Sequence, residues 1–312
     1  MKVLLLTPKH PPSYTDDLYL ALRAKVGTCD FYPLDERQSS NLEEFFARHI
    51  RLAHFDRILL MFDGKFIYEQ SPFLRRLPTL GVLSLNYDGN DALINKRMIS
   101  NFTTMPWLRW IGSNLELCHQ YQDQGYDAYW IPSVFDNQKF VQRIRKRVTR
   151  YCYVYGNKAA CDLVSESLSH AMSVMPLSKE EVLNDDSIHF ASEDIFVFWP
   201  DTHDNDMSPM IKAMACGAAV VSRDVSMEKR VLYGWHEGRD MLYATDELHL
   251  IRLLRQLVLD ETLIRTLSHH AVQKVKLFYP QTVGKRIGAH LEVPVRNPGD
   301  YRMKQRIFGF DI

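Results

Sequence analysis

Short runs dominated by apolar residues alternate with amphipathic stretches from the start of the chain. Lys2–Leu6 and Arg57–Phe62 have the composition of strands buried on both faces of a parallel sheet. Thr15–Lys25 and Asn41–Ala53 carry apolar residues at helical spacing. This alternation predicts a parallel sheet covered by helices on both faces. Further strands are expected at Cys29–Leu34, Val82–Tyr87, Trp107–Ile111 and Tyr129–Ile131, and further helices at Asp91–Ser100 and Leu115–Gln124.

The same rhythm restarts in the second half of the chain. Tyr151–Tyr155 reads as a strand that ends at Gly156, and Ala159–Ala171 reads as the helix that follows it. The later expected strands are Ile188–Phe190, Ile195–Trp199 and Ala219–Ser222, and the later expected helices are Pro209–Cys216, Asp246–Val258 and Glu261–Phe278. The sequence therefore predicts an α/β fold of two Rossmann-like, doubly wound domains facing across a cleft (1–135 and 151–291), a linker (136–150) and a tail (292–312) that crosses back to the first domain.

Size and composition agree with this division. A chain of 312 residues is long for one core and suits two domains. Lys+Arg and Asp+Glu both number 38, so the chain lacks the basic surplus of a dedicated nucleic-acid binder. The first apolar run is too short for a secretory signal or a membrane-spanning helix, which leads us to expect a cytoplasmic protein. The five cysteines show no Cys-x-x-Cys spacing, so neither a zinc site nor a disulfide framework is indicated.

The most informative loop follows the expected strand Ile195–Trp199. It leads directly into a helix, for which Ser208 is the expected N-cap and Pro209 the expected first residue. In open α/β sheets, ligands bind at the carboxyl ends of the strands. A helix that begins there presents free backbone N–H groups and the positive end of its dipole. The loop therefore predicts an anion site that suits a diphosphate.

From this loop onward the sequence resembles a known family. The segment MSPMIKAMACGAAVVS (Met207–Ser222) is similar to the donor site of GT-B glycosyltransferases of the glycosyl transferases group 1 type, including its CgeB-like branch. In that family two acidic residues, eight positions apart, contact the donor sugar and the ribose. The resemblance gives Asp204 the sugar contact and the amides of Met207 and Ser208 the phosphate contacts. Lys212 stands where the second acidic residue is expected. A Lys cannot accept hydrogen bonds from ribose, so we expect it to pair with the diphosphate.

Three other stretches carry the same resemblance. Tyr126–Phe140 resembles the crossing between the two domains, Tyr153–Val164 the first strand and turn of the second domain, and Gly238–Val275 the end of that domain. The resemblance implies a metal-independent hexosyl- or pentosyltransferase, with the acceptor on the first domain and a UDP- or GDP-linked sugar as co-substrate on the second, and with no other cofactor. Further residues implied at the donor site are Gly156, Asn157, Lys158, His203, Asn205, Asp206 and Arg223.

Candidates on the first domain follow two of its expected strands. His10, Ser13 and Tyr14 lie in the loop after the first strand and are placed to face the acceptor, although the adjacent prolines allow a purely structural loop. An inverting enzyme needs a carboxylate to deprotonate the acceptor hydroxyl. Asp88 is the candidate for that base, since Asp91 is better explained as an N-cap. The acceptor itself, whether a glycan, a lipid or a small molecule, stays open.

Alternative interpretations remain at three places. The Asp204-Asn205-Asp206 triplet also fits a metal-binding Asp-x-Asp motif or a polar capping loop. A basic cluster within 143–150 fits a solvated linker, a peripheral membrane contact or DNA, the last as in phage-type enzymes that glycosylate DNA bases. Lys212 also fits a non-catalytic homologue that binds nucleotide sugars without transferring them.

Overall fold

The computed structural model describes residues 1–77, 79–85, 92–142, 150–178, 181, 190–200, 206–295, 306–307 and 310–311. The chain folds into two compact units. Unit 1 comprises Met1–Val134 together with Pro280–Ile312, and unit 2 comprises Phe135–Tyr279. The chain therefore passes between the units twice, once after Val134 and once after Tyr279.

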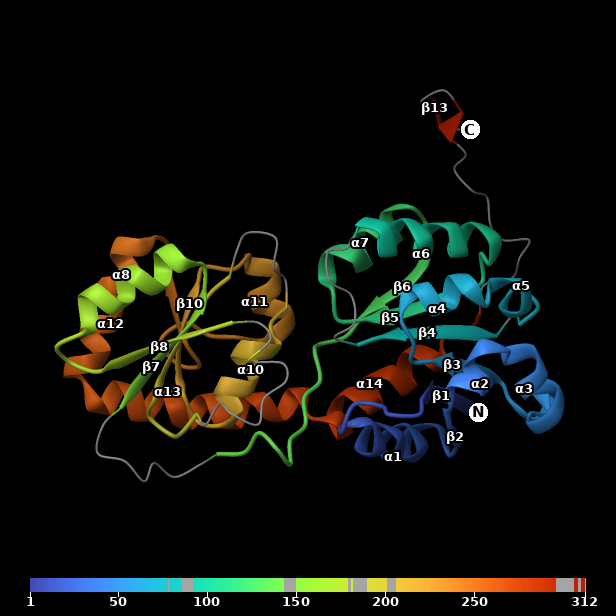
Figure 1. The fold of residues 1–312 in the computed structure, drawn as a ribbon, viewed down its shortest axis with the longest axis horizontal. Helices are drawn as coiled ribbons and strands as arrows, with labels where there is room; N and C mark the ends of the chain where they lie inside the picture. Colours follow the sequence, from blue (N-terminus) through green and yellow to red (C-terminus); the bar gives the residue numbers. More distant parts are fainter. Residues whose placement is uncertain are drawn as a thin grey trace. The chain divides into compact units, whose positions relative to one another are not determined.

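Unit 1 is built on a six-stranded parallel sheet in the order β2-β1-β3-β4-β5-β6 (Figure 1). Its strands are β1 (Lys2–Pro8), β2 (Thr28–Leu34), β3 (Arg57–Leu60), β4 (Leu80–Ser84), β5 (Arg109–Gly112) and β6 (Asp127–Trp130). Its helices are α1 (Thr15–Val26), α2 (Glu36–Ser40), α3 (Leu42–His49), α4 (Gly64–Glu69), α5 (Ser71–Leu74), α6 (Ala92–Thr104), α7 (Leu115–Asp123) and α14 (Pro280–Glu292), and a short 3-10 turn covers Leu52–His54.

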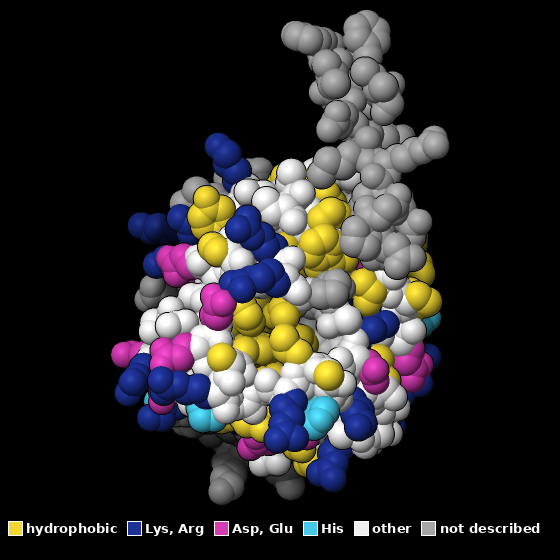
Figure 2. All heavy atoms as spheres, turned by 90° about the vertical axis from the view of Figure 1, so that its right-hand side faces the viewer, with side chains coloured by type: hydrophobic (Ala, Val, Ile, Leu, Met, Phe, Trp, Pro, Cys, Tyr) yellow, Lys and Arg dark blue, Asp and Glu magenta, His cyan; other side chains and the backbone are white. Residues whose placement is uncertain are grey.

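Successive residues of β1 serve the two cores of unit 1. Leu4 and Leu6 belong to the core beneath α3 to α7, whereas Val3 and Leu5 belong to the core beneath α1 and α14. A strand buried on both faces is continuously apolar, which is why this run is easily recognised in the sequence. On the outside of unit 1, apolar side chains reach the surface between charged ones (Figure 2), as they do in most folded domains.

Unit 2 is built on a five-stranded parallel sheet in the order β11-β10-β9-β7-β8. Its strands are β7 (Tyr151–Gly156), β8 (Ser173–Leu177), β9 (Ile195–Trp199), β10 (Ala219–Arg223) and β11 (Leu242–Ala244). Its helices are α8 (Lys158–Leu168), α10 (Ser208–Ala215), α11 (Met227–Tyr233), α12 (Glu247–Leu259) and α13 (Glu261–Lys274), and α13 continues into a 3-10 turn at Val275–Phe278.

Each sheet contains one point at which the strand order reverses. In unit 1 this switch point lies between β1 and β3, because β2 continues on one side and β4 on the other. In unit 2 it lies between β7 and β9, with β8 on one side and β10 on the other. Chain segments leave a switch point in opposite directions, and the crevice that opens there is where doubly wound folds bind ligands. The predicted fold class is confirmed, and the topology supplies two candidate crevices.

The chain returns to unit 1 earlier than the sequence analysis expected. The sequence pattern assigns residues up to 291 to the second domain and places the start of the returning tail at Glu292. In the structure the return begins at Pro280, where α14 starts and lies against α1. A Cβ atom added at Gly284 would come within 2.6 Å of the Ala21 Cβ. Glycine therefore allows the two helices to approach closely, and this contact makes α14 part of unit 1.

Candidate functional site

Strand β7 ends in a glycine at the switch point of unit 2. Gly156 lies opposite Trp199, the last residue of β9. A Cβ atom at position 156 would stand 2.4 Å from the Trp199 carbonyl oxygen, a distance that no side chain can adopt without moving the backbone. A glycine here allows the two backbones to lie close together. The predicted site residue Gly156 therefore lies at the carboxyl edge of the sheet.

Helix α8 begins directly after this glycine. Asn157 is its N-cap, and the Asn157 side chain accepts a hydrogen bond of 3.0 Å from the Ala160 N–H. Lys158 is the first helical residue, and its side chain is exposed. A cation at a helix N-terminus opposes the helix dipole, so this placement lowers the stability of α8 unless an anion is bound nearby.

Helix α10 begins on the other side of the switch point, after β9. Ser208 is the first helical residue and Met207 the N-cap, so the expectation that Ser208 caps the helix is wrong. The Asp206 carboxylate, one residue before the N-cap, accepts a hydrogen bond of 2.9 Å from the Ser208 N–H, which has no partner within the helix. The Ser208 hydroxyl is buried and has no hydrogen-bond partner in the described part of the chain.

The first turns of the helices in unit 2 differ in charge. Acidic residues occupy the first turns of α11, α12 and α13, namely Glu228, Glu247 and Glu261. Neither α8 nor α10 has an acidic residue in its first turn. These are the two helices that flank the switch point. Their N-termini keep their positive potential, apart from the Asp206 carboxylate before α10, and are therefore suited to an anionic ligand.

Lys212 and Arg223 add positive charge to this edge of the sheet. Lys212 lies one turn into α10 and is only 8% exposed, with its Nζ 5.0 Å from the centre of the Phe140 ring. Arg223, the last residue of β10, is exposed, and its guanidinium carbon lies 5.6 Å from the centre of the Trp199 ring. Both contacts are within the range of cation–π attraction. The aromatic partners hold the two cations in place, a feature that the sequence motif did not reveal.

The loop after β1 in unit 1 differs from the expectation at one residue. His10 and Ser13 are exposed, as a residue facing an acceptor must be. Tyr14 is only 7% exposed and belongs to the hydrophobic core beneath α1 and α14. The Tyr14 ring therefore stabilises unit 1, and we withdraw it from the acceptor candidates.

Several candidates lie outside the described residues. They are Asp88, Asp91, Arg143, Arg145, Lys146, Arg147, His203, Asp204 and Asn205. The described member of the basic cluster is Arg150, whose side chain is 13% exposed and pairs with Glu193 at 3.2 Å and with Glu261 at 3.1 Å. Arg150 is thus engaged in ion pairs within unit 2. Among the residues that the structure covers, no group of three or more His, Cys, Asp or Glu side chains could hold a metal ion.

Comparison with known proteins identifies the fold. No family model matches the sequence, and no curated protein matches it. Among solved structures, HepE of Anabaena in complex with UDP and glucose is 11% identical, with a TM-score of 0.56 over 94% of this chain and 100% of HepE. A glycosyltransferase of Rickettsia africae is 9% identical, with a TM-score of 0.55 over 94% of this chain and 99% of that protein.

Another similar structure is the N-terminal domain of Candida albicans trehalose-6-phosphate phosphatase, which is 9% identical, with a TM-score of 0.53 over 93% of this chain and 96% of that domain. The two parallel-sheet units and these likenesses show that the chain has the GT-B fold of glycosyltransferases. The CgeB-like subtype stays a prediction. Within the part of the chain that was searched, no helix is long and apolar enough to cross a membrane.

Proposed function

We propose that the protein is a glycosyltransferase whose nucleotide-sugar donor binds through its diphosphate at the switch point of unit 2. The observation that carries this proposal is electrostatic. The two helices that begin at the switch point lack acidic residues in their first turns, and Lys158 and Lys212 lie on them instead. The charge of Lys158 beside the N-terminus of α8 is repelled by the helix dipole, and a bound diphosphate removes that cost. Lys212, in the last turn of α10, adds a second positive charge to the same edge of the sheet.

The same groups suit the chemistry of glycosyl transfer. The bond between the anomeric carbon and the diphosphate oxygen breaks, an acceptor hydroxyl oxygen bonds to that carbon, and the hydroxyl proton is removed. Negative charge develops on the departing diphosphate. Lys158, Lys212 and the exposed Arg223 would stabilise that charge, and fixed charges aimed at a developing anion are a large catalytic term. On the basis of the family resemblance, Asp204 would hold the donor sugar and Asp88 would take the proton.

The donor nucleotide is proposed from two considerations. HepE of Anabaena, which shares the fold, has been solved with UDP-glucose, and this makes a UDP-linked sugar the first donor to test. Lys212 cannot accept hydrogen bonds from ribose hydroxyls. We therefore expect the diphosphate to supply more of the binding energy than the nucleoside, so that GDP-linked sugars are the second class to test.

The experiment is calorimetric titration of the purified protein with a panel of UDP- and GDP-sugars, followed by measurement of nucleoside diphosphate release from those that bind. We expect at least one nucleotide sugar to bind and to release its nucleoside diphosphate. Asp204→Ala should lower turnover by about 10²-fold or more, the scale of losing one positioned polar contact. Asp162→Ala, at an exposed position of α8, is the control and should keep full turnover. Full turnover in Asp204→Ala would remove Asp204 from the site.

A second function in this class is favoured by Lys212. A homologue that binds nucleotide sugars without transferring the sugar would retain the fold and the diphosphate site and would lose the acidic contacts. Tight binding of a nucleotide sugar, with no release of nucleoside diphosphate in the presence or absence of candidate acceptors, would favour this homologue. The ion pairs of Arg150 give no support to DNA as the acceptor.

A further inference from the structure

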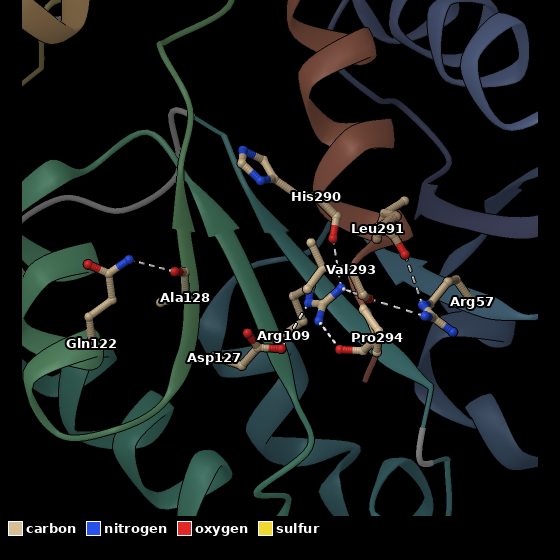
Figure 3. Close-up of polar contacts among 9 residues, drawn as sticks. All are labelled: Arg57, Arg109, Gln122, Asp127, Ala128, His290, Leu291, Val293 and Pro294. Carbon is tan, nitrogen blue, oxygen red and sulfur yellow. Dashed lines mark hydrogen bonds and ion pairs between the residues drawn. The ribbon is translucent and has the colours of Figure 1, made fainter. Parts of the chain in front are cut away.

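The amino edge of the sheet in unit 1 holds the end of α14 through charged side chains (Figure 3). Arg57, Arg109 and Asp127 are the first residues of β3, β5 and β6, and we call them the α14 clasp. The side chains of Arg109 and Asp127 are each 3% exposed, and the Arg109 Nε donates to the Asp127 Oδ2 at 2.9 Å. This buried ion pair fixes the guanidinium of Arg109 across the strand ends.

The two arginines of the α14 clasp donate to backbone carbonyls at the end of α14. Arg109 donates to the carbonyls of His290 (2.7 Å), Val293 (2.8 Å) and Pro294 (2.9 Å). Arg57 donates to the carbonyls of Leu291 (3.1 Å) and Val293 (3.3 Å). The last carbonyls of a helix have no partners within the helix and carry the negative end of its dipole. The arginines therefore cap α14 and attach it to the sheet.

His290 lies in the last turn of α14, against this cluster of positive charge. Its ring stacks on Tyr129 of β6, with ring centres 4.7 Å apart. The guanidinium of Arg109 lies over the same tyrosine, 5.2 Å from its ring centre. A protonated histidine usually stabilises a helix C-terminus. Here two guanidiniums already occupy that end, so a further positive charge would be repelled.

Charged groups around His290 come from every element that packs near it. Arg109 faces it from β5, Asp127 stands at the start of β6 as the partner of Arg109, and Arg286 lies one turn earlier on α14. On the side of α1, Lys25 pairs with Glu292 at 3.3 Å. Burial, followed by the charges of Arg109 and Arg286, lowers the pKa of His290 below its ordinary value of 6.5.

We propose that His290 makes the α14 clasp responsive to pH: the clasp holds the end of α14 while His290 is neutral, and protonation of His290 loosens it. Because the histidine pKa is lower in the folded state than in the unfolded state, its contribution is fully present above about pH 6.5. That contribution is lost as the pH falls from this value toward the folded-state pKa. The clasp thus acts on the end of α14 that lies away from the passage of the chain between the units, which enters α14 at Pro280.

The test is hydrogen exchange of the full chain at about pH 7.5 and about pH 5.5, corrected for the intrinsic effect of pH on amide exchange. This range brackets the ordinary histidine pKa. We expect amides of α14 and of its partner α1 to exchange faster at the lower pH, by at most about tenfold, since pH 5.5 lies about one unit below the ordinary histidine pKa and one unit of pH changes a proton-linked equilibrium tenfold at most. Amides of α12 and α13, which belong to unit 2, should show no such change.

Three substitutions distinguish an effect of His290 protonation from an effect of the packing of its ring. His290→Phe keeps an aromatic ring against Tyr129 and should abolish the pH effect. Arg286→Gln removes one of the charges that lower the pKa of His290 and should weaken the effect. His170→Gln, at an exposed histidine of unit 2, is the matched control and should retain it fully. Equal corrected exchange of α14 at both pH values, or a pH effect that persists in His290→Phe, would overturn the proposal.

Discussion

The switch points of the two units are built alike but differ in charge. In unit 1, α1 follows β1 and has Asp16 and Asp17 in its first turn. Helix α4 after β3 has no acidic residue in its first turn and begins at the Asp63 carboxylate, much as α10 begins after the Asp206 carboxylate. In unit 2, the first turns of α8 and α10 lack acidic residues, and Lys158 begins α8. Both topologies offer helix N-termini at a crevice, which alone would bind an anion. We propose that the contrast between Asp16 and Asp17 on α1 and Lys158 on α8 directs a diphosphate to unit 2.

The largest expected effect comes from distorting the strand ends at the switch point of unit 2. Gly156→Ala places a Cβ atom against the Trp199 carbonyl, so the ends of β7 and β9 must move apart. We expect the free energy of unfolding to fall by about 1–3 kcal/mol, which is typical of overpacking. Binding of UDP should weaken by about 100-fold, as expected when two phosphate contacts are displaced. Chemical denaturation and calorimetry measure the two effects.

Gly81→Ala is the matched control in unit 1. A Cβ atom there would meet the Leu59 Cδ1 at 3.1 Å, which is the flexible end of a side chain rather than backbone. UDP affinity should be unchanged in this variant. Equal losses of UDP affinity in the two glycine variants would mean that Gly156 affects binding only through general stability.

The next effect concerns the buried cation of α10. Lys212→Met keeps the volume and removes the charge, so UDP should bind about 10- to 100-fold more weakly, the range for loss of a charge-assisted hydrogen bond. Uridine should bind as before. Lys285→Met, at an exposed position of α14, is the control. Equal losses for uridine and UDP would place Lys212 away from the phosphates.

The smallest expected effect is that of Lys158→Glu, which should raise the stability of the protein and lower its affinity for UDP. Lys158→Glu places an acidic residue at the start of α8, which should stabilise the helix by about 0.3–1 kcal/mol. The same change puts a negative charge beside the diphosphate and should weaken UDP binding several-fold. Lys65→Glu makes the equivalent change near the start of α4 in unit 1 and should leave UDP affinity unaltered. A Lys158→Glu protein that binds UDP as well as the wild type would remove α8 from the site.

The elements that could be predicted from the sequence are those in which burial fixes the order of apolar and polar residues. Ile195–Trp199 was predicted with its observed bounds because every residue of a strand buried on both faces is apolar. The edge strand β8 was not predicted, since it is largely exposed and contains Pro176. Helix α14 contains Gly284 and Gly288, which lower helix propensity. Its assignment to unit 1 depends on contacts with α1 that no local pattern encodes.

The candidate site was predictable in part, for similar reasons. The positions of Gly156 and α10 followed from strand and helix signals. The hydrogen bond from the Ser208 N–H to Asp206 depends on the geometry of the loop, and burial of Tyr14 depends on contacts with helix α14, which is distant in the sequence. The absence of acidic residues from the first turns of α8 and α10 is visible in the sequence. Its meaning becomes clear only when β7 and β9 are known to flank the switch point of unit 2.

The central claim is that unit 2, and not unit 1, accepts the diphosphate. A crystal structure of the chain with UDP tests it most directly. The account predicts that the phosphates lie at the ends of β7 and β9, within reach of Lys158 and Lys212. Phosphates bound instead between the ends of β1 and β3, beside the loop that contains His10 and Ser13, would contradict it.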